Sequence, residues 1–308
     1  MKRLSLLLAV LFSLAACERT RHDPPPARPT APAPAPTATK TLLSARLTRP
    51  AAAAVIAIGD LHGDLTATRS ALRLAGAIDD ADRWVGGKLV VVQTGDVLDR
   101  GDEDRAVLDL LDRLRDEAKR AGGELISLAG NHEVMNVMGD FRYITQGGFD
   151  AFGGPEARLD AFKPGGPYAL RIAERSIYVR VGDTLFVHGG VLDKHVEYGL
   201  DRIQDELRAW MRGERPEPPL MLMTEDGPIW TRLYSDPTLP SDCEQLSRVL
   251  AKLDAKRMVV GHTPQQAGIT SACEGKVWRI DTGMSRFYGG KVEVLELRGG
   301  DARVRKAP

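Results

Sequence analysis

Residues 95–101 place two carboxylates and a guanidinium in one short turn. Asp96 and Asp99 lie three positions apart, and Arg100 follows directly. Two carboxylates this close repel each other unless a cation lies between them, and Arg100 alone neutralises only one of them. The turn follows residues 89–92, an apolar run that suits a strand buried on both faces. Because ligands of open α/β sheets bind at the carboxyl ends of strands, the turn predicts a metal site.

Four other segments repeat this pattern, in which an apolar strand ends in an Asp, Asn or His beside glycine. Asp60 and His62 follow residues 55–58, Asn131 and His132 follow residues 125–128, His188 follows residues 184–187, and His262 follows residues 257–260. Glycine lets the backbone turn sharply there and approach a ligand closely. A single match is weak, because strand ends are rich in glycine and aspartate and a capped turn would explain any one of them. Five matches in order predict one shared site.

The ordered motifs resemble the calcineurin-like metallophosphoesterases and, within them, the phosphoprotein phosphatase family. The matching segments are residues 59–63, 95–101, 130–133 and 188–190, together with His262. The wider superfamily has a second histidine two residues after the last one. Here that position is Pro264, as in the phosphoprotein phosphatase branch. Residues 84–87 and 131–136 are similar to the bacterial Shewanella-like protein phosphatases.

The resemblance implies two divalent metal ions that share one carboxylate. Carried over position by position, it assigns the first ion to Asp60, His62 and Asp96, and the second to Asp96, Asn131, His188 and His262. Carboxylate, imidazole and amide ligands in this mixture suit manganese, iron or zinc better than magnesium or copper. Manganese is the metal we expect, with iron and zinc as alternatives.

The resemblance also implies roles for the remaining polar residues of the motifs. A water activated by the two metals would attack phosphorus, with no covalent enzyme intermediate. His132 would be the general acid that protonates the leaving oxygen, and Asp99 would orient its imidazole. Arg100 and Asn131 would bind the substrate phosphate. Arg232 is the candidate for a second phosphate-binding arginine, with a structural ion pair as the alternative.

The segments between the motifs supply the elements that must position them. Residues 65–75 and 102–120 carry apolar side chains at helical spacing, and Asp64 precedes the first as an N-cap. Alternating strands and helices predict parallel strands, and the whole predicts an α/β fold of two packed mixed β-sheets flanked by helices. The pattern further predicts helices at residues 201–211 and 243–253, a hairpin at 177–187, and strands at 277–280 and 292–297 that complete the second sheet.

Residues 139–166 have a different composition, with glycine pairs and five aromatic side chains. They predict an insertion beside the site. Two interpretations remain open: the insertion shapes the substrate cleft, or it is a helical cap with its own aromatic core.

The amino terminus predicts export and lipidation. Residues 1–16 form a lipoprotein signal peptide, with Lys2 and Arg3 ahead of an apolar core too short to span a bilayer. The sequence Leu-Ala-Ala-Cys that ends at Cys17 resembles a lipobox, although an ordinary cleaved signal is the alternative. Glu18 follows, which favours the outer over the inner membrane. We expect a protein that faces the periplasm and touches the membrane only through a lipid on Cys17.

Composition divides the rest of the chain. Residues 17–50 are rich in proline and alanine and predict an extended stalk, residues 51–298 the metallophosphoesterase domain, and residues 299–308 a tail. Basic and acidic residues both total 42, so no net charge attracts nucleic acid and no such partner is expected.

Cys243 and Cys273 are the remaining cysteines, and outside the cytoplasm we expect them to pair, with two inert thiols as the alternative.

Three functions fit these features. The first is a protein phosphatase that acts on a phosphorylated protein or peptide. The sequence leaves open whether it prefers phosphotyrosine or phosphoserine and phosphothreonine. The second is a hydrolase of small phosphate esters or dinucleoside polyphosphates. A non-catalytic binding lipoprotein is the third, and it is disfavoured because no ligand position is missing.

Overall fold

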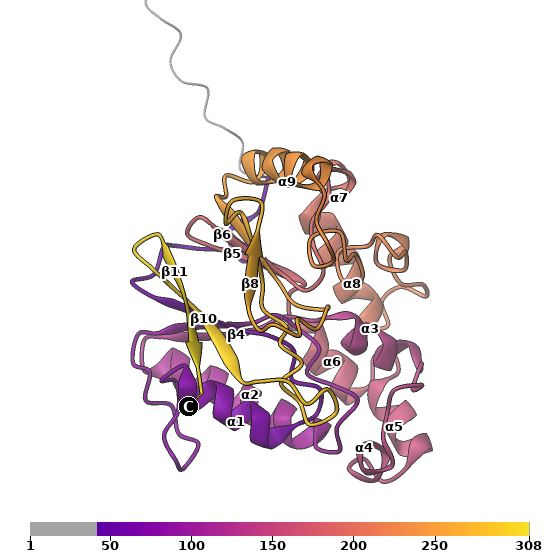
Figure 1. Cartoon of the computed structure of the whole chain (residues 1–308). Helices are drawn as coiled ribbons and strands as arrows, with labels where there is room; N and C mark the ends of the chain where they lie inside the picture. Colours follow the sequence, from indigo (N-terminus) through magenta and orange to yellow (C-terminus); the bar gives the residue numbers. More distant parts are fainter. Residues whose placement is uncertain (1–41, 308) are drawn as a thin grey trace, which may run out of the picture. The chain divides into compact units, whose positions relative to one another are not determined.

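The computed structural model describes residues 42–307. Within them the chain forms two β-sheets that pack face to face, with helices on the outer side of each sheet (Figure 1). The predicted α/β class with two mixed sheets is therefore confirmed. The predicted signal peptide, the lipidated cysteine and most of the stalk lie outside the described residues.

The first sheet carries the motifs from the amino-terminal half of the domain. Its strand order is β11-β10-β2-β3-β4, and β2, β3 and β4 run parallel. The strands are β2 (Val55–Ile58), β3 (Val90–Gln93), β4 (Glu124–Ser127), β10 (Glu293–Arg298) and β11 (Asp301–Lys306). Strand β2 is apolar throughout because both of its faces are buried: Val55 and Ala57 pack toward the second sheet, and Ile56 and Ile58 pack in the cluster that includes the helices.

Two helices cover the outer face of this sheet and carry the chain from strand to strand (Figure 1). They are α1 (Leu65–Leu74) and α2 (Asp104–Arg120). The Asp64 carboxylate accepts a hydrogen bond of 2.9 Å from the Ala67 N–H, which confirms the predicted N-cap. Helix α2 buries the apolar stripe that its sequence predicts, including Val107 and Leu114.

The second sheet supplies the other two motifs. Its order is β1-β5-β6-β7-β9-β8. The strands are β1 (Thr48–Arg49), β5 (Tyr178–Val181), β6 (Thr184–Val187), β7 (Arg257–Val260), β8 (Thr270–Ala272) and β9 (Val277–Arg279). Strands β5 and β6 form the predicted antiparallel hairpin. The prediction that residues 292–297 complete this sheet is wrong: β10 pairs with β2 in the first sheet, because an apolar strand pattern does not specify a partner.

Both predicted ends of the domain need correction. Leu43 and Leu47 lie in the core, and β1 pairs with β5, so residues 43–49 belong to the folded domain rather than to the stalk. Residues 301–306 form β11, which pairs with β10 along its whole length, so they are no tail. The composition of β11 is polar because it is an edge strand whose charged side chains face solvent.

The remaining helices surround the ends of the sheets. They are the short 3-10 turns η1 (Ala45–Leu47) and η2 (Leu220–Leu222), and the α-helices α3 (Asn131–Met138), α4 (Gln146–Asp150), α5 (Pro155–Phe162), α6 (Pro167–Ala173), α7 (Asp193–Tyr198), α8 (Leu200–Met211) and α9 (Pro240–Lys252). Within residues 42–307, none of the helices is both long enough and apolar enough to cross a bilayer. Cys243 of α9 forms the expected disulfide with Cys273, with a Cα–Cα distance of 5.2 Å.

Both interpretations of residues 139–166 find support. Helices α4 and α5 form a cap in which Phe152 and Phe162 pack edge to face, with Tyr168 of α6 against both rings. Tyr143, at the start of the same segment, instead lies against His132 of the predicted site. The insertion is therefore a helical cap whose first residues reach the site.

Candidate active site

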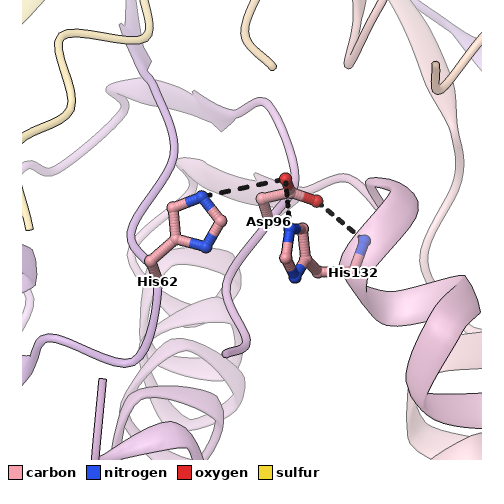
Figure 2. A group of neighbouring side chains, drawn as sticks. All are labelled: His62, Asp96 and His132. Atoms are coloured by element: carbon pink, nitrogen blue, oxygen red, sulfur yellow. Dashed lines mark hydrogen bonds and ion pairs between the residues drawn. The ribbon is translucent and has the colours of Figure 1, made fainter. Parts of the chain in front are cut away.

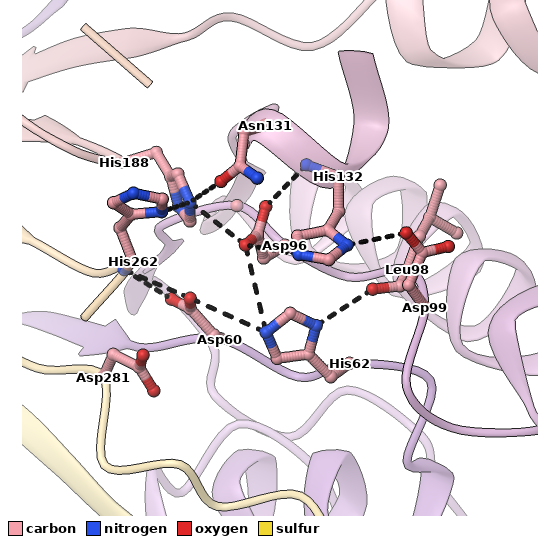
Figure 3. Close-up of polar contacts among 12 residues, drawn as sticks. Asp60, His62, Asp96, Leu98, Asp99, Asn131, His132, His188, His262 and Asp281 are labelled. Atoms are coloured by element: carbon pink, nitrogen blue, oxygen red, sulfur yellow. Dashed lines mark hydrogen bonds and ion pairs between the residues drawn. The ribbon is translucent and has the colours of Figure 1, made fainter. Parts of the chain in front are cut away.

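The five strand ends converge on one buried cluster (Figure 3). Asp60 and His62 follow β2, Asp96 follows β3, Asn131 and His132 begin α3 after β4, His188 follows β6 and His262 follows β7. None of the seven side chains belongs to a residue more than 7% exposed. Segments from both sheets therefore meet at one cluster.

Asp96 lies at the centre of this cluster (Figure 3), with His62 and His132 on either side of its carboxylate (Figure 2). Its Oδ2 atom lies 3.1 Å from His188 Nε2 and 3.9 Å from His62 Nε2. Two groups of potential metal-binding atoms, each within 4.8 Å of one another, overlap at this carboxylate: one joins Asp96 to His62 and His132, and the other joins it to His188 and His262. Asp96 therefore belongs to both groups, as a ligand shared by two ions would.

Backbone carbonyls fix how two of the imidazoles face Asp96. His62 Nδ1 lies 3.0 Å from the Leu98 carbonyl oxygen, and His188 Nδ1 lies 2.9 Å from the Thr94 carbonyl oxygen. A carbonyl only accepts hydrogen bonds, so each Nδ1 carries a proton and each ring directs its Nε2 atom toward the centre. This is how histidine ligands of metals are ordinarily oriented.

Lone pairs also converge on the side of His188. Its Nε2 atom lies 3.0 Å from Asn131 Oδ1 and 3.2 Å from His262 Nδ1, in addition to Asp96. One nitrogen cannot donate to all of them, so several acceptors face one another in a buried site. Such an arrangement is unfavourable without a cation, and the donor set of carboxylate, amide oxygen and imidazole nitrogen fits a divalent metal ion.

The pKa shifts of the buried side chains also indicate that the cluster requires positive charge. Burial, reinforced by the negative charges of Asp281 and Asp96, raises the pKa of Asp60 well above its usual range. Burial opposes ionisation of Asp96 as well, but the nearby His188 and His132 hold the pKa of its carboxyl well below the usual range. Burial lowers the pKa of His62 to about 4, so that imidazole is neutral at physiological pH and free to act as a ligand.

His132 and Asp99 form a pair beside this centre. His132 Nδ1 lies 2.6 Å from Asp99 Oδ2, and both residues are buried. Burial alone would lower the pKa of His132, but the charge of Asp96 and the hydrogen bond to Asp99 raise it to about 9. His132 is therefore protonated at neutral pH, with Nδ1 donating to Asp99 and Nε2 directed toward the centre, 3.8 Å from Asp96 Oδ2.

Arg100 lies at the rim, held by aromatic rings. Its guanidinium carbon is 3.9 Å from the centre of the Tyr143 ring and 4.8 Å from that of Phe287. Its backbone N–H donates to the Tyr143 carbonyl at 3.0 Å. A cavity of about 290 Å³ opens here, lined by Arg100, Arg286 and Phe287 among others, and His62 reaches it from the cluster. The arrangement offers a fixed cation to an anionic ligand.

Arg232 lies beside His262. It is exposed, and its Nη1 atom donates to the His262 carbonyl oxygen at 3.0 Å and to Thr263 Oγ1 at 2.8 Å. Both acceptors are neutral, so these bonds give the arginine a structural role without forming the ion pair that was the alternative. They also leave its second terminal nitrogen available to an anion at the rim.

Sequence reasoning missed two buried carboxylates. Glu133 accepts hydrogen bonds from the N–H groups of Asp96, Val97 and Gly130 at 2.7 to 2.9 Å, so it holds the turn that carries Asp96. Its place at the third position of a glycine-capped helix was the available signal. Asp281 lies next to Asp60, and its Oδ2 atom has no hydrogen-bond partner within residues 42–307.

Asp281 had a sequence signal too. It follows β9 and Ile280 and is succeeded by Thr282 and Gly283, so it repeats the pattern of an apolar strand ended by a carboxylate and glycine. The family resemblance carries no role to this position, so the pattern alone could have identified it.

The fold and the site together define a metal-dependent phosphoesterase. Residues 53–266 match the family model of the calcineurin-like phosphoesterases. The chain belongs to that family, which confirms the resemblance.

Similar proteins support the assignment to the calcineurin-like phosphoesterases. Shewanella-like protein phosphatase 2 of Arabidopsis thaliana is 39% identical over 85% of this chain and 79% of its own length. Shewanella-like protein phosphatase 1 of Plasmodium berghei is 33% identical over 76% of this chain and 68% of its own length. Among solved structures, the cold-active protein-tyrosine phosphatase of a psychrophilic Shewanella species superposes with a TM-score of 0.72 at 26% identity, covering 84% of this chain and 82% of that one.

Proposed function

We propose that this protein is a two-metal phosphatase that removes phosphate from phosphorylated proteins or peptides. The observation that carries the proposal is the position of Asp96, which is common to two groups of metal-binding atoms and adjoins a protonated imidazole. Similarity to protein phosphatases of plant, parasite and bacterial origin supports the substrate class.

The proposed ligands divide into two sets around this carboxylate. Asp60, His62 and Asp96 would hold one ion, and Asp96, Asn131, His188 and His262 the other. Manganese is the proposed metal, with iron or zinc as alternatives, because the donors are mixed oxygen and nitrogen atoms. When bound, such ions supply an acidified water and neutralise the charge of a phosphate group.

The residues of the chain would carry out binding and proton transfer. Arg100, already held against the Tyr143 ring, would bind phosphate oxygens together with Asn131 and Arg232. His132 would pass its Nε2 proton to the leaving oxygen. Asp99 would keep the imidazole oriented and charged until then.

The substrate class is tested by comparing a panel of phosphopeptides with dinucleoside polyphosphates. We expect kcat/KM to be higher for phosphopeptides by at least about tenfold, equivalent to about 1.4 kcal/mol. The physical reason is the exposed apolar rim around Arg100, where Phe287 can pack against a peptide side chain.

Phosphotyrosine, phosphoserine and phosphothreonine peptides of one sequence should be measured in parallel, since the proposal covers all three. The Asp96→Asn protein, prepared identically, controls for contaminating phosphatases. A higher kcat/KM for the dinucleotides would make the alternative hydrolase the better interpretation.

We also propose that a lipid on Cys17 anchors the protein to a membrane on its periplasmic side, with the outer membrane favoured. The motif that ends at this cysteine is the basis of the proposal. Cys17→Ser should move the protein from the membrane fraction to the soluble fraction, because the thiol is the site of lipid attachment. The matched control is Thr20→Ala, which leaves the cysteine in place. Equal recovery of both variants in the membrane fraction would contradict the proposal.

A further inference from the structure

We infer that Arg158 is a positioning residue for the proton donor: a buried guanidinium, supplied by the cap helix α5, that holds Asp99 and through it His132. This inference rests on the proposed function, because it concerns the same acid.

Arg158 is fully buried, and each of its three side-chain nitrogens donates at least one hydrogen bond. Nη2 lies 2.6 Å from Asp104 Oδ2 and 2.7 Å from Asn136 Oδ1. Nη1 donates to the Gly148 carbonyl oxygen at 2.8 Å, and Nε lies 3.1 Å from the same Asn136 oxygen. A buried arginine is costly unless its charge is paired, so this one requires an explanation.

The two partners that bind Arg158 through their side chains, Asn136 and Asp104, also contact Asp99. Asn136 Nδ2 donates to Asp99 Oδ1 at 2.8 Å, and Asp104 Oδ1 accepts from the Asp99 N–H at 2.9 Å. Because Arg158 donates to Asn136 Oδ1, the amide can present only its NH₂ group to Asp99. Nη2 of Arg158 itself lies 3.6 Å from Asp99 Oδ1. Oδ2 of Asp99 is thereby left to His132, 2.6 Å away.

The turn that carries Asp99 needs such support. Asp99 and Arg100 have φ angles of 70° and 68°, in the left-handed region that side chains other than glycine rarely adopt. Residues held in this region persist when their surroundings fix them. Here the surroundings come from the cap: the Arg158 guanidinium lies 4.8 Å from the centre of the Phe152 ring and 4.9 Å from that of Phe162. The aromatic core of the cap thus holds Arg158 in place, and Arg158 stabilises the turn that contains Asp99.

The competing explanation is that Arg158 only neutralises the buried carboxylate of Asp104. Arg158→Met cannot separate the two roles, because it removes both the hydrogen bonds and the neutralising charge. The double variant Asp104→Asn with Arg158→Met can. Its buried pair is neutral again, and the amide oxygen introduced by Asp104→Asn can still accept from the Asp99 N–H.

The kinetic experiment compares phenyl phosphate, a poor leaving group, with p-nitrophenyl phosphate, a good one. In Arg158→Met we expect kcat to fall by about 10–100-fold for phenyl phosphate, the size of effect seen when outer partners of a site are removed. The loss for p-nitrophenyl phosphate should be much smaller, because its leaving group departs without a proton. The double variant should regain the melting temperature of the wild type while keeping the altered ratio of the two rates.

Two controls accompany these variants. Arg171→Met removes another arginine that stacks on the cap, 4.7 Å from the Tyr168 ring centre, but its carboxylate partners lie on α2 away from Asp99. It should leave the ratio unchanged. Arg158→Lys retains the charge but cannot bridge Asn136, Asp104 and Gly148 together, so it should give a smaller change in the ratio. It also replaces Arg158→Met should the latter not fold.

A spectroscopic measurement separates failure of this inference from failure of the proposed function. In the zinc-loaded protein, the proton that His132 Nδ1 shares with Asp99 should give a downfield resonance, identified by its loss in His132→Asn. Replacing Arg158 should shift or broaden it whether or not His132 acts as the acid. An unchanged resonance, equal rate losses for the two substrates, or recovery of the wild-type ratio in the double variant would each overturn the inference.

Discussion

Asp96→Asn should lower the occupancy of both metal sites at once. Asp96 Oδ2 faces His188 on one side and His62 on the other, so a single ligand is removed from two sets. We expect the affinity for each ion to fall by at least about 10²-fold, the upper end of the effect of losing an outer partner of a ligand. Turnover should fall further than the about 10²–10⁴-fold expected from loss of a general acid.

The substitution is mild in every other respect. Asp96 has a φ of 57°, which asparagine tolerates, and an amide oxygen can still accept the hydrogen bond from the His132 N–H. Elemental analysis and calorimetric metal titration measure the outcome. Asp82→Asn is the matched control, since Asp82 has a φ of 55° and lies outside the site, where it pairs with Arg69. Two ions bound with wild-type affinity in Asp96→Asn would refute the shared-ligand assignment.

The site was predictable because its polar residues directly follow strands that have a clear apolar sequence pattern. Each motif follows a short strand whose apolar residues are buried or partly buried, and glycine marks where the strand ends. The hydrophobic effect places these strands in the sheets, and parallel strands bring their carboxyl ends to one edge. The local sequence pattern therefore indicates where Asp60, Asp96 and His188 lie in the fold. The same logic, applied once more, would have identified Asp281.

The errors come from interactions that leave no local pattern. The partner of β10 is chosen by packing across the sheet, and β11 is recognised only by its pairing with β10. Arg158 lies in the aromatic-rich insertion, and nothing in the surrounding sequence marks it as different from an arginine that faces solvent. Its burial follows from the cap closing over the turn at Asp99, which joins residues 54 or more positions apart. No local pattern in the sequence marks this contact, whereas each strand end of the site is marked by an apolar run and glycine.

His132→Asn should separate proton donation from metal binding. Geometry alone permits two roles for this imidazole, because its Nε2 atom belongs to one of the groups of potential metal-binding atoms while its Nδ1 atom is paired with Asp99. If His132 is the acid, both ions remain bound in the variant. If it is a ligand, one ion is lost. Metal content of the same preparations therefore decides between the roles before any rate is measured.

The rates then test the acid directly. We expect kcat to fall by about 10²–10⁴-fold for an alkyl phosphate, since an alkoxide leaves poorly without a proton. The loss for p-nitrophenyl phosphate should be much smaller, because nitrophenolate is stable as an anion. Asp99→Asn should give the same pattern in milder form: it weakens the orientation and charge of His132 but leaves the imidazole in place. Equal losses for both substrates in His132→Asn, with both ions retained, would instead make His132 a phosphate-binding residue.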